Sequence, residues 1–291
     1  MEVRRILPSE IAESAHLYVG GDPETARTEF LRLSHEHKWN PMCQVVARDG
    51  ALRGILLYFP LADGSWLCDQ PRLGAKADPA LLAALLTGVR DAARGAGVGL
   101  VRYHAEGGAG DLETPLKRAD WSCPASLVRL HRTASIPLPP SPPSLLSWEE
   151  RPPARPGDLI EIVRATQEGS SDVPELEPRS YTTLDFFLPH SPRGDARWAV
   201  AIRASVPIGC LLVNLHHDDP HAEIRYMGIV PSARGRGLGL HLVRRAVEIA
   251  REAGVPEVRL AVDRRNVAAL KTYQAAGFRE YGGFDLWIAR Q

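Results

Sequence analysis

Hydrophobic and polar residues follow a helical period downstream of a glycine-rich stretch and a strand period upstream of it. After Gly239, apolar side chains recur at helical spacing on one face and polar side chains occupy the other. The apolar face consists of Leu242, Val243, Ala246, Val247, Ile249 and Ala250, and the polar face of His241, Arg244, Arg245, Glu248, Arg251 and Glu252. Upstream, residues 208–215 and 222–229 have the composition of two buried strands. The pattern therefore predicts two strands, a glycine loop and an amphipathic helix.

The six residues from His216 to His221 separate these two strands. The segment reads His-His-Asp-Asp-Pro-His, and its histidines and carboxylates are residue types that bind metals. Asp-Asp-Pro is also typical of a turn between strands. We favour the turn and expect no metal site there.

A second amphipathic pattern, in the first half of the chain, aligns with the first at an offset of 157 residues. Leu85, Leu86, Val89 and Arg94 fall on Leu242, Val243, Ala246 and Arg251, and Ala119-Asp120-Trp121 falls on Ala276-Gly277-Phe278. Between the halves, the proline-rich stretch 137–144 predicts an extended linker, because proline removes backbone donors and fixes φ. The alternative is a fortuitous match of two similar helix–strand units. We expect two related domains, 1–136 and 146–291, joined by residues 137–145.

Composition limits the class of protein. The chain has 291 residues, room for two domains, and its 35 Lys and Arg balance its 35 Asp and Glu, which argues against nonspecific nucleic-acid binding. No apolar run is long enough to cross a membrane, and the first residues do not form a secretory signal. Its four cysteines are scattered without a C-x-x-C pair, which suggests reduced thiols in a cytoplasmic protein and makes a zinc site unexpected.

The glycine loop between strand and helix is the main candidate for chemistry. Residues 230–239 read Val-Pro-Ser-Ala-Arg-Gly-Arg-Gly-Leu-Gly. Glycines let a ligand approach the main chain, and unpaired N–H groups at a helix start attract a pyrophosphate. The spacing fits neither the nucleotide P-loop nor the dinucleotide fingerprint. The alternative is a helix whose start is glycine-rich for other reasons.

This loop and a second segment carry a resemblance to the GCN5-related N-acetyltransferase (GNAT) family. Arg234-x-x-Gly237-x-Gly239 resembles the family's acetyl-CoA loop, and residues 266–278 match its segment N-x-x-A-x-x-x-Y-x-x-x-G-F. The resemblance covers residues 146–291. It implies acetyl-CoA as cosubstrate, bound by Met227, Ile229, Val230, Arg234, Gly235, Arg236, Gly237, Leu238, Gly239 and Asn266.

The resemblance also implies the fold and candidate catalytic residues. We expect an α/β protein with two tandem GNAT-like domains, each a mixed twisted sheet flanked by helices, similar in architecture to two-domain members such as mycothiol synthase. Tyr273 occupies the position of the family's general acid; the alternative is a tyrosine that only packs in the core. Glu223 is the candidate base and should share a strand face with Arg225, Met227 and Ile229; the alternative is a solvated residue paired with an arginine.

The first half lacks the residues that would bind the cosubstrate. The offset places Arg234 on Ala77, Gly237 on Ala80 and Gly239 on Leu82. Leu82 would put a side chain where a pyrophosphate needs bare backbone. We therefore expect a degenerate first domain without a cofactor site.

Taken together, the sequence predicts an acetyl-CoA-dependent N-acetyltransferase that acts on a small-molecule primary amine by direct attack in a ternary complex. The acceptor is expected to bind within residues 169–196, which contain Asp172, Glu175, Glu177, Tyr181, Asp185 and Phe186. The protein is expected to be a monomer or homodimer. The alternatives are an acyl-CoA-responsive binding protein without turnover and a protein N-terminal or lysine acetyltransferase.

Overall fold

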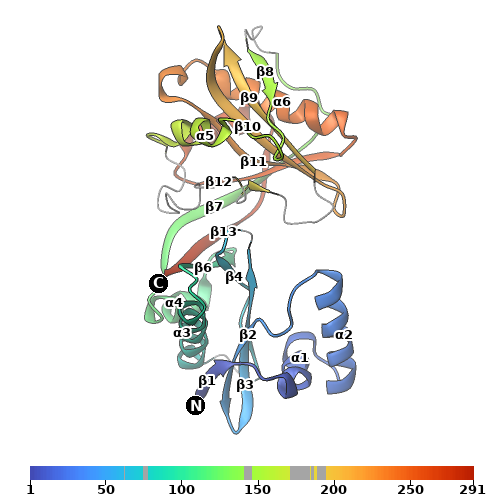
Figure 1. The fold of residues 1–291 in the computed structure, drawn as a ribbon, viewed down its shortest axis with the longest axis vertical. Coiled ribbons are helices and arrows are strands. Elements are labelled where there is room, and N and C mark those ends of the chain that lie inside the picture. Colours follow the sequence, from blue (N-terminus) through green and yellow to red (C-terminus); the bar gives the residue numbers. More distant parts are fainter. Residues whose placement is uncertain (62, 75–77, 141–145, 171–183, 185–186, 189–194) are drawn as a thin grey trace. The chain divides into compact units, whose positions relative to one another are not determined.

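The computed structural model describes the chain except for residues 62, 75–77, 141–145, 171–183, 185–186 and 189–194. The chain forms two compact units (Figure 1). The first unit comprises Met1–Pro124 and Phe284–Gln291, and the second comprises Ala125–Gly283. Across the described residues, no helix combines the length and apolar character that a bilayer span requires.

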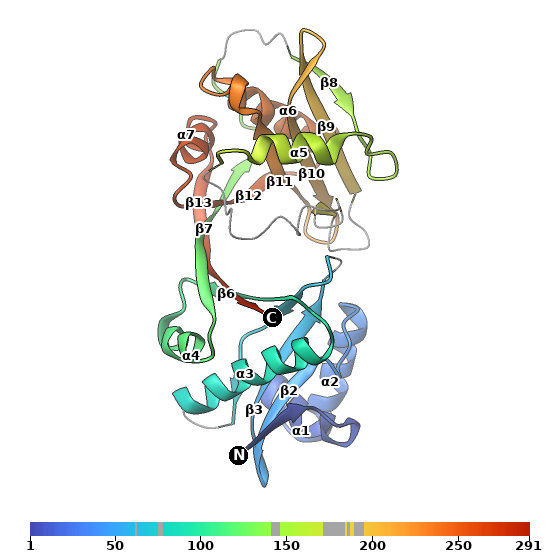
Figure 2. The same cartoon turned by 60° about the vertical axis from the view of Figure 1, so that its left-hand side comes forward.

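The first unit is a mixed sheet with helices on both faces. Its strands are β1 (Glu2–Arg5), β2 (Gln44–Asp49), β3 (Ala51–Pro60), β4 (Trp66–Cys68), β5 (Arg72–Leu73) and β6 (Leu100–Glu106). Its helices are α1 (Ile11–Val19), α2 (Pro23–Glu36), α3 (Pro79–Gly95) and α4 (Glu113–Arg118). Helix α3 covers one face of this sheet, and α1 and α2 cover the other (Figure 2). On β3, Leu56 and Tyr58 belong to the core under α3, whereas Ile55 and Leu57 belong to the core under α1 and α2. This alternation is what a sheet buried on both faces requires.

The second unit has the same construction. Its strands are β8 (Ser147–Glu150), β9 (Asp195–Arg203), β10 (Val206–His216), β11 (His221–Ile229) and β12 (Glu257–Asp263), and its helices are α5 (Leu159–Gln167), α6 (Leu238–Glu252) and α7 (Val267–Ala275). Leu211, Val213 and Leu215 of β10 face the core under α6 and α7, while Cys210 and Leu212 face α5. The β11–β12 pair is parallel and its neighbours are antiparallel. The expected α/β fold with mixed sheets flanked by helices is confirmed.

Each unit is completed by a strand segment that follows the other unit's last helix. Strand β7 (Ser122–Thr133) follows α4, but its residues 127–133 pair with β12 of the second unit. Strand β13 (Arg279–Arg290) follows α7, but its residues 284–290 pair with β6 of the first unit. The units therefore differ from the expected ranges 1–136 and 146–291, because local sequence patterns do not reveal which sheet a strand joins.

The strands of the two halves keep the 157-residue offset that the sequence predicts. The bounds of β6 and β12 differ by 157 at both ends (257 − 100 and 263 − 106), and so do those of β7 and β13 (279 − 122 and 290 − 133). The two exchanged pairings also have the same register, since Glu257 faces Thr133 as Leu100 faces Arg290. Both copies of the repeat therefore give their last strand segment to the sheet of the other unit.

Candidate active site

The glycine loop lies between a strand and a helix, as its sequence predicts. A short 3-10 helix, Pro231–Ala233, follows β11, and Gly237 is the N-cap of α6. Gly235 and Gly237 have φ of +74° and +72°, in the left-handed region that side chains rarely adopt. A Cβ at either position would meet no atom within 4 Å, so the space beside this backbone is open.

The start of α6 has no side-chain cap, although the amide of Leu240 in its first turn donates to the carbonyl oxygen of Gly237 at 3.2 Å. No side chain of the described residues caps this helix, and its first turn has no acidic residue. The first four N–H groups of a helix have no partner within the helix and carry the positive end of its dipole. The start of α6 is therefore suited to bind an anion.

A cavity of about 590 Å³ opens over this loop. Eight of the residues that the sequence assigns to the cosubstrate line it: Met227, Ile229, Arg234, Gly235, Gly237, Leu238, Gly239 and Asn266. Among its described lining residues, the charged ones are Arg234 and Lys271, both cationic. The sequence analysis missed Lys271, Thr166 and Tyr226, which also line the cavity; Lys271 lies within the segment 266–278, but nothing in its residue type singled it out.

The cavity wall contains a bulge in β11. Tyr226 pairs with Leu212, but Val213 pairs with Ile224, so Arg225 is an extra residue in β11. The β11–β12 pairing covers only Ala222 and Glu223, although β11 continues to Ile229. The two strands therefore part beyond Glu223, which exposes backbone of β11 to the cavity.

This bulge corrects the expectation that Glu223 shares a face with Met227. Ile224 belongs to the core under α6, and Met227 packs against that same core. The extra residue Arg225 shifts the alternation by one position, so Met227 is on the face of Ile224 and Glu223 is on the other face. A strict period of two cannot reveal such an insertion.

Arg234 acts mainly as a clamp within the protein. Its Nε donates to the carbonyl oxygen of Ile229 at 2.9 Å, and its two terminal nitrogens donate to those of Thr166 at 2.9 Å and Gly169 at 3.2 Å. Three of the five guanidinium N–H groups are thus committed to the end of β11 and to the residues at the end of α5. Arg234 fixes the loop against α5.

Two of the assigned residues, Val230 and Arg236, are not among the described residues that line the cavity. The amide of Val230 donates to the carbonyl oxygen of Ile208 at 3.0 Å, so this N–H is not available to the cosubstrate. Arg236 is exposed to solvent.

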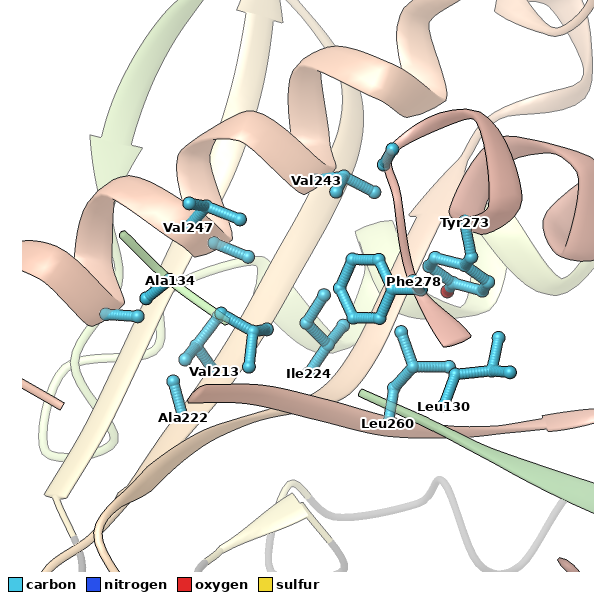
Figure 3. Close-up of a cluster of buried hydrophobic side chains, with 14 of the residues drawn as sticks. Leu130, Ala134, Val213, Ala222, Ile224, Val243, Val247, Leu260, Tyr273 and Phe278 are labelled. Carbon is cyan, nitrogen blue, oxygen red and sulfur yellow. The ribbon is translucent and has the colours of Figure 1, made fainter. Parts of the chain in front are cut away.

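Asn266 directly precedes α7, and Tyr273 lies near the end of this helix. The Asn266 side-chain oxygen accepts from the amide of Ala269 at 3.1 Å, which makes Asn266 the N-cap of this helix. Tyr273 is 6% exposed and packs against Phe278, with ring centroids 5.6 Å apart. Figure 3 shows its ring among Phe278, Leu130 and Leu260. Tyr273 is not among the described residues that line the cavity, although its neighbour Thr272 is.

Glu223 lies in a cluster of charged side chains near the hairpin of β10 and β11. Its carboxylate is 3.1 Å from His216 Nε2 and 3.7 Å from an Arg225 nitrogen. The His216 and His221 rings stack with centroids 4.4 Å apart. Burial lowers the pKa of His221, which favours its neutral form.

The residues between His216 and His221 form the predicted turn, which is confirmed by the pairing of these two histidines. Asp219 forms an ion pair with Arg259, which holds the pKa of Asp219 below its usual value. Within the described part of the chain, no three His, Cys, Asp or Glu side chains are grouped as metal ligands.

The corresponding helix start in the first unit is closed by the protein itself. Asp78 is the N-cap of α3, and its carboxylate accepts from the amide of Ala80 at 2.9 Å. Pro79 removes one N–H at the first helical position, and Leu82 is buried. All three residues of β4 pair with β6, so these strands do not part within β4.

Two further sets of residues were considered in the sequence analysis, the acceptor residues and the cysteines. The acceptor residues Asp172, Glu175, Glu177, Tyr181, Asp185 and Phe186 lie outside the described residues. The four cysteines are free thiols, and burial raises the pKa of Cys210 to about 12, which makes it a poor nucleophile.

Comparisons with known proteins identify the same region. Residues 159–278 match the acetyltransferase (GNAT) family. A mycothiol acetyltransferase of Mycolicibacterium paratuberculosis is 33% identical over 164 residues, 50% of this chain and 50% of that protein. One of Thermobispora bispora is 27% identical over 172 residues, 54% of each chain. The alignments thus span only about half of these curated relatives.

Two solved structures share the whole fold. A GCN5-related N-acetyltransferase from Sphaerobacter thermophilus matches 99% of this chain and 95% of its own, with a TM-score of 0.59 and 16% identity. A tandem GNAT protein from the clavulanic acid biosynthesis pathway matches 99% and 98%, with a TM-score of 0.59 and 15% identity. Residues 159–278 therefore match the acetyltransferase (GNAT) family, and the whole chain has the fold of the tandem GNAT structures.

Proposed function

We propose that this protein transfers an acetyl group from acetyl-CoA to a primary amine of a small molecule, by direct attack in a ternary complex. The observation that carries the proposal is the start of α6, which is glycine-lined, uncapped by any described side chain, and open to a cavity whose described charged residues are both cationic. The mycothiol acetyltransferases among its relatives support a small-molecule acceptor.

The cavity residues fit the proposed cosubstrate. A pyrophosphate needs bare backbone and free N–H donors, which Gly235, Gly237 and the first turn of α6 provide. The parted strands β11 and β12 leave an extended backbone against which a pantetheine arm can pair. Acetyl-CoA would supply the thioester at this opening. We place it in the second unit alone, because Asp78 already caps α3 with a negative charge in the first.

We assign Tyr273 as the general acid for the departing thiolate. A thiol has a reference pKa of about 8.5 and a tyrosine of about 10, so a positioned hydroxyl can protonate or stabilise the sulfur. Support comes from its place on α7, the helix that lines the cavity through Ala269 and Thr272. Its packing against Phe278 holds the ring in one orientation.

Glu223 remains our candidate base, but it would have to act at a distance. Tyr226 lines the cavity, and Glu223 lies three residues before it, which is roughly 10 Å along a strand. A base must reach its proton directly or through one water. We therefore expect a relay of water, or an acceptor that extends along β11, if Glu223 takes part.

Calorimetric titration of acetyl-CoA into the full-length protein tests the proposal. We expect one binding site per chain; two sites would place a cosubstrate in the first unit, and no binding would refute the proposed function. Tyr273→Phe should lower kcat by about a hundredfold or more while the Kd for acetyl-CoA stays the same. Tyr281→Phe is a matched control in the same unit, since Tyr281 is 50% exposed. Unchanged kcat in Tyr273→Phe would refute its role, and binding without turnover of any amine would favour a sensor protein.

A further inference from the structure

The two cations of the cavity differ in how the protein uses them. Arg234 already donates three hydrogen bonds to the carbonyl oxygens of Thr166, Gly169 and Ile229. These bonds fix the plane of the guanidinium, so its remaining donors cannot turn freely toward a ligand. The loop's other arginine, Arg236, is not among the described residues that line the cavity.

Lys271, unlike Arg234, has a side chain that the described part of the protein does not hold in place. Its side chain is exposed, lines the cavity from α7, and forms no hydrogen bond or ion pair with the residues that the structure describes. Its ammonium is a compact charge on a flexible stem, which lets it follow a ligand into position.

The packing of α6 on α7 places Lys271 close to the anion-binding backbone. A Cβ on Gly239, in the first turn of α6, would lie 3.2 Å from Cγ2 of Thr272. Thr272 is the residue next to Lys271, so α7 passes over the turn whose N–H groups are open. A ligand phosphate at that turn lies within range of a lysine side chain on α7.

We infer that Lys271 binds a phosphate of the proposed CoA cosubstrate and that Arg234 positions the loop without being the main phosphate contact. The inference rests on the proposed function and names the side chain that distinguishes CoA from a phosphate-free thioester. The repeat agrees with this assignment, because the residue 157 positions before Lys271 is Thr114, in the unit without the open helix start.

Titration calorimetry of Lys271→Ala with three probes tests this inference. The probes are acetyl-CoA, its 3′-dephospho form and S-acetylpantetheine, which has no pyrophosphate. We expect acetyl-CoA to bind on the order of tenfold more weakly, as for loss of a charge-assisted hydrogen bond, and S-acetylpantetheine to bind as in the wild type. The loss should shrink at about 0.5 M salt, because an exposed ion pair is screened.

Two variants control for charge and for folding. Lys271→Arg should restore most of the affinity, because it keeps the charge. Lys117→Ala removes the same charge from α4, the equivalent helix of the first unit, where Lys117 pairs with Glu113, and should leave binding unchanged.

The probes also identify which phosphate is bound. If Lys271→Ala costs nothing with the 3′-dephospho probe, Lys271 contacts the 3′-phosphate; if the cost persists, it contacts the pyrophosphate. Wild-type affinity of Lys271→Ala for acetyl-CoA, or an equal loss with S-acetylpantetheine, would overturn the inference. A wild-type protein that binds no acetyl-CoA would instead refute the proposed function.

Discussion

The exchanged strands predict which fragment of the chain can fold by itself. Residues 125–283 contain the whole second unit, including the β7 segment that pairs with β12. Residues 146–291, the range suggested by sequence patterns, lack that segment and contain 284–290, its repeat equivalent. We predict that fragment 125–283 folds and binds acetyl-CoA, whereas fragment 146–291 does neither.

The reason is that β13 cannot replace β7 in the second sheet. The offset of 157 would place Asp285 at the position of Val128, which is 2% exposed, and Trp287 at that of Leu130, which is 4% exposed. Burying an unpaired carboxylate costs several kcal/mol, and an oversized side chain adds about 1–3 kcal/mol. Leaving the site empty instead loses the burial of Val128 and Leu130, about 3–6 kcal/mol together. Each of these two free-energy costs is comparable to the whole free energy of unfolding of a small domain, about 5–15 kcal/mol.

Urea unfolding followed by circular dichroism, with acetyl-CoA calorimetry, compares the two fragments. A rescue variant of fragment 146–291 carrying Asp285→Val and Trp287→Leu should recover cooperative unfolding, because its last strand then matches the core of the second unit. Cooperative folding of the unmodified 146–291 fragment, with the stability of 125–283, would refute this reasoning.

Two single substitutions test the packing of β11 on α5 and the cap of α3. Gly228→Ala should destabilise the protein by about 1–3 kcal/mol in urea unfolding, because its Cβ would lie 2.4 Å from Oγ1 of the buried Thr166. Gly282→Ala, whose Cβ meets nothing within 4 Å, is the control, and equal stabilities would contradict the packing. Asp78→Ala should cost about 1 kcal/mol by removing the cap of α3, without changing the acetyl-CoA stoichiometry. A second binding site in that variant would show that Asp78 alone closes the first unit.

Local sequence patterns predicted the loop and the helices well, because the physics that fixes them is local. Gly235 and Gly237 adopt the left-handed backbone that glycine favours, and Asn266 caps α7 as an asparagine before a helix should. The repeat also followed from sequence, since both copies keep the same spacing of apolar residues from α3 or α6 onward. These features depend on residues a few positions apart.

The bulge, the strand exchange and the role of Arg234 depend on partners far away in the chain. Arg225 becomes an extra residue only because of its register with β10, and that moves Glu223 to the face opposite Met227. Arg234 is 65 residues or more from the carbonyls of Gly169 and Thr166 that it binds. A sequence shows that an arginine stands in a phosphate loop, but not that the main chain has already claimed its donors.

The two helix starts show how one fold gives two different outcomes. Both α3 and α6 begin with N–H groups that need an acceptor. The first unit supplies its own carboxylate, because Asp78 is the N-cap of α3, whereas the N-cap of α6 is Gly237 and no described side chain caps that helix. An external anion therefore contributes to the stability of the second unit in the way that Asp78 contributes to that of the first. On this argument, losing a cofactor site requires little change in the sheet: a capping carboxylate at the start of one helix accepts from a backbone donor and places a negative charge where an anionic ligand would bind.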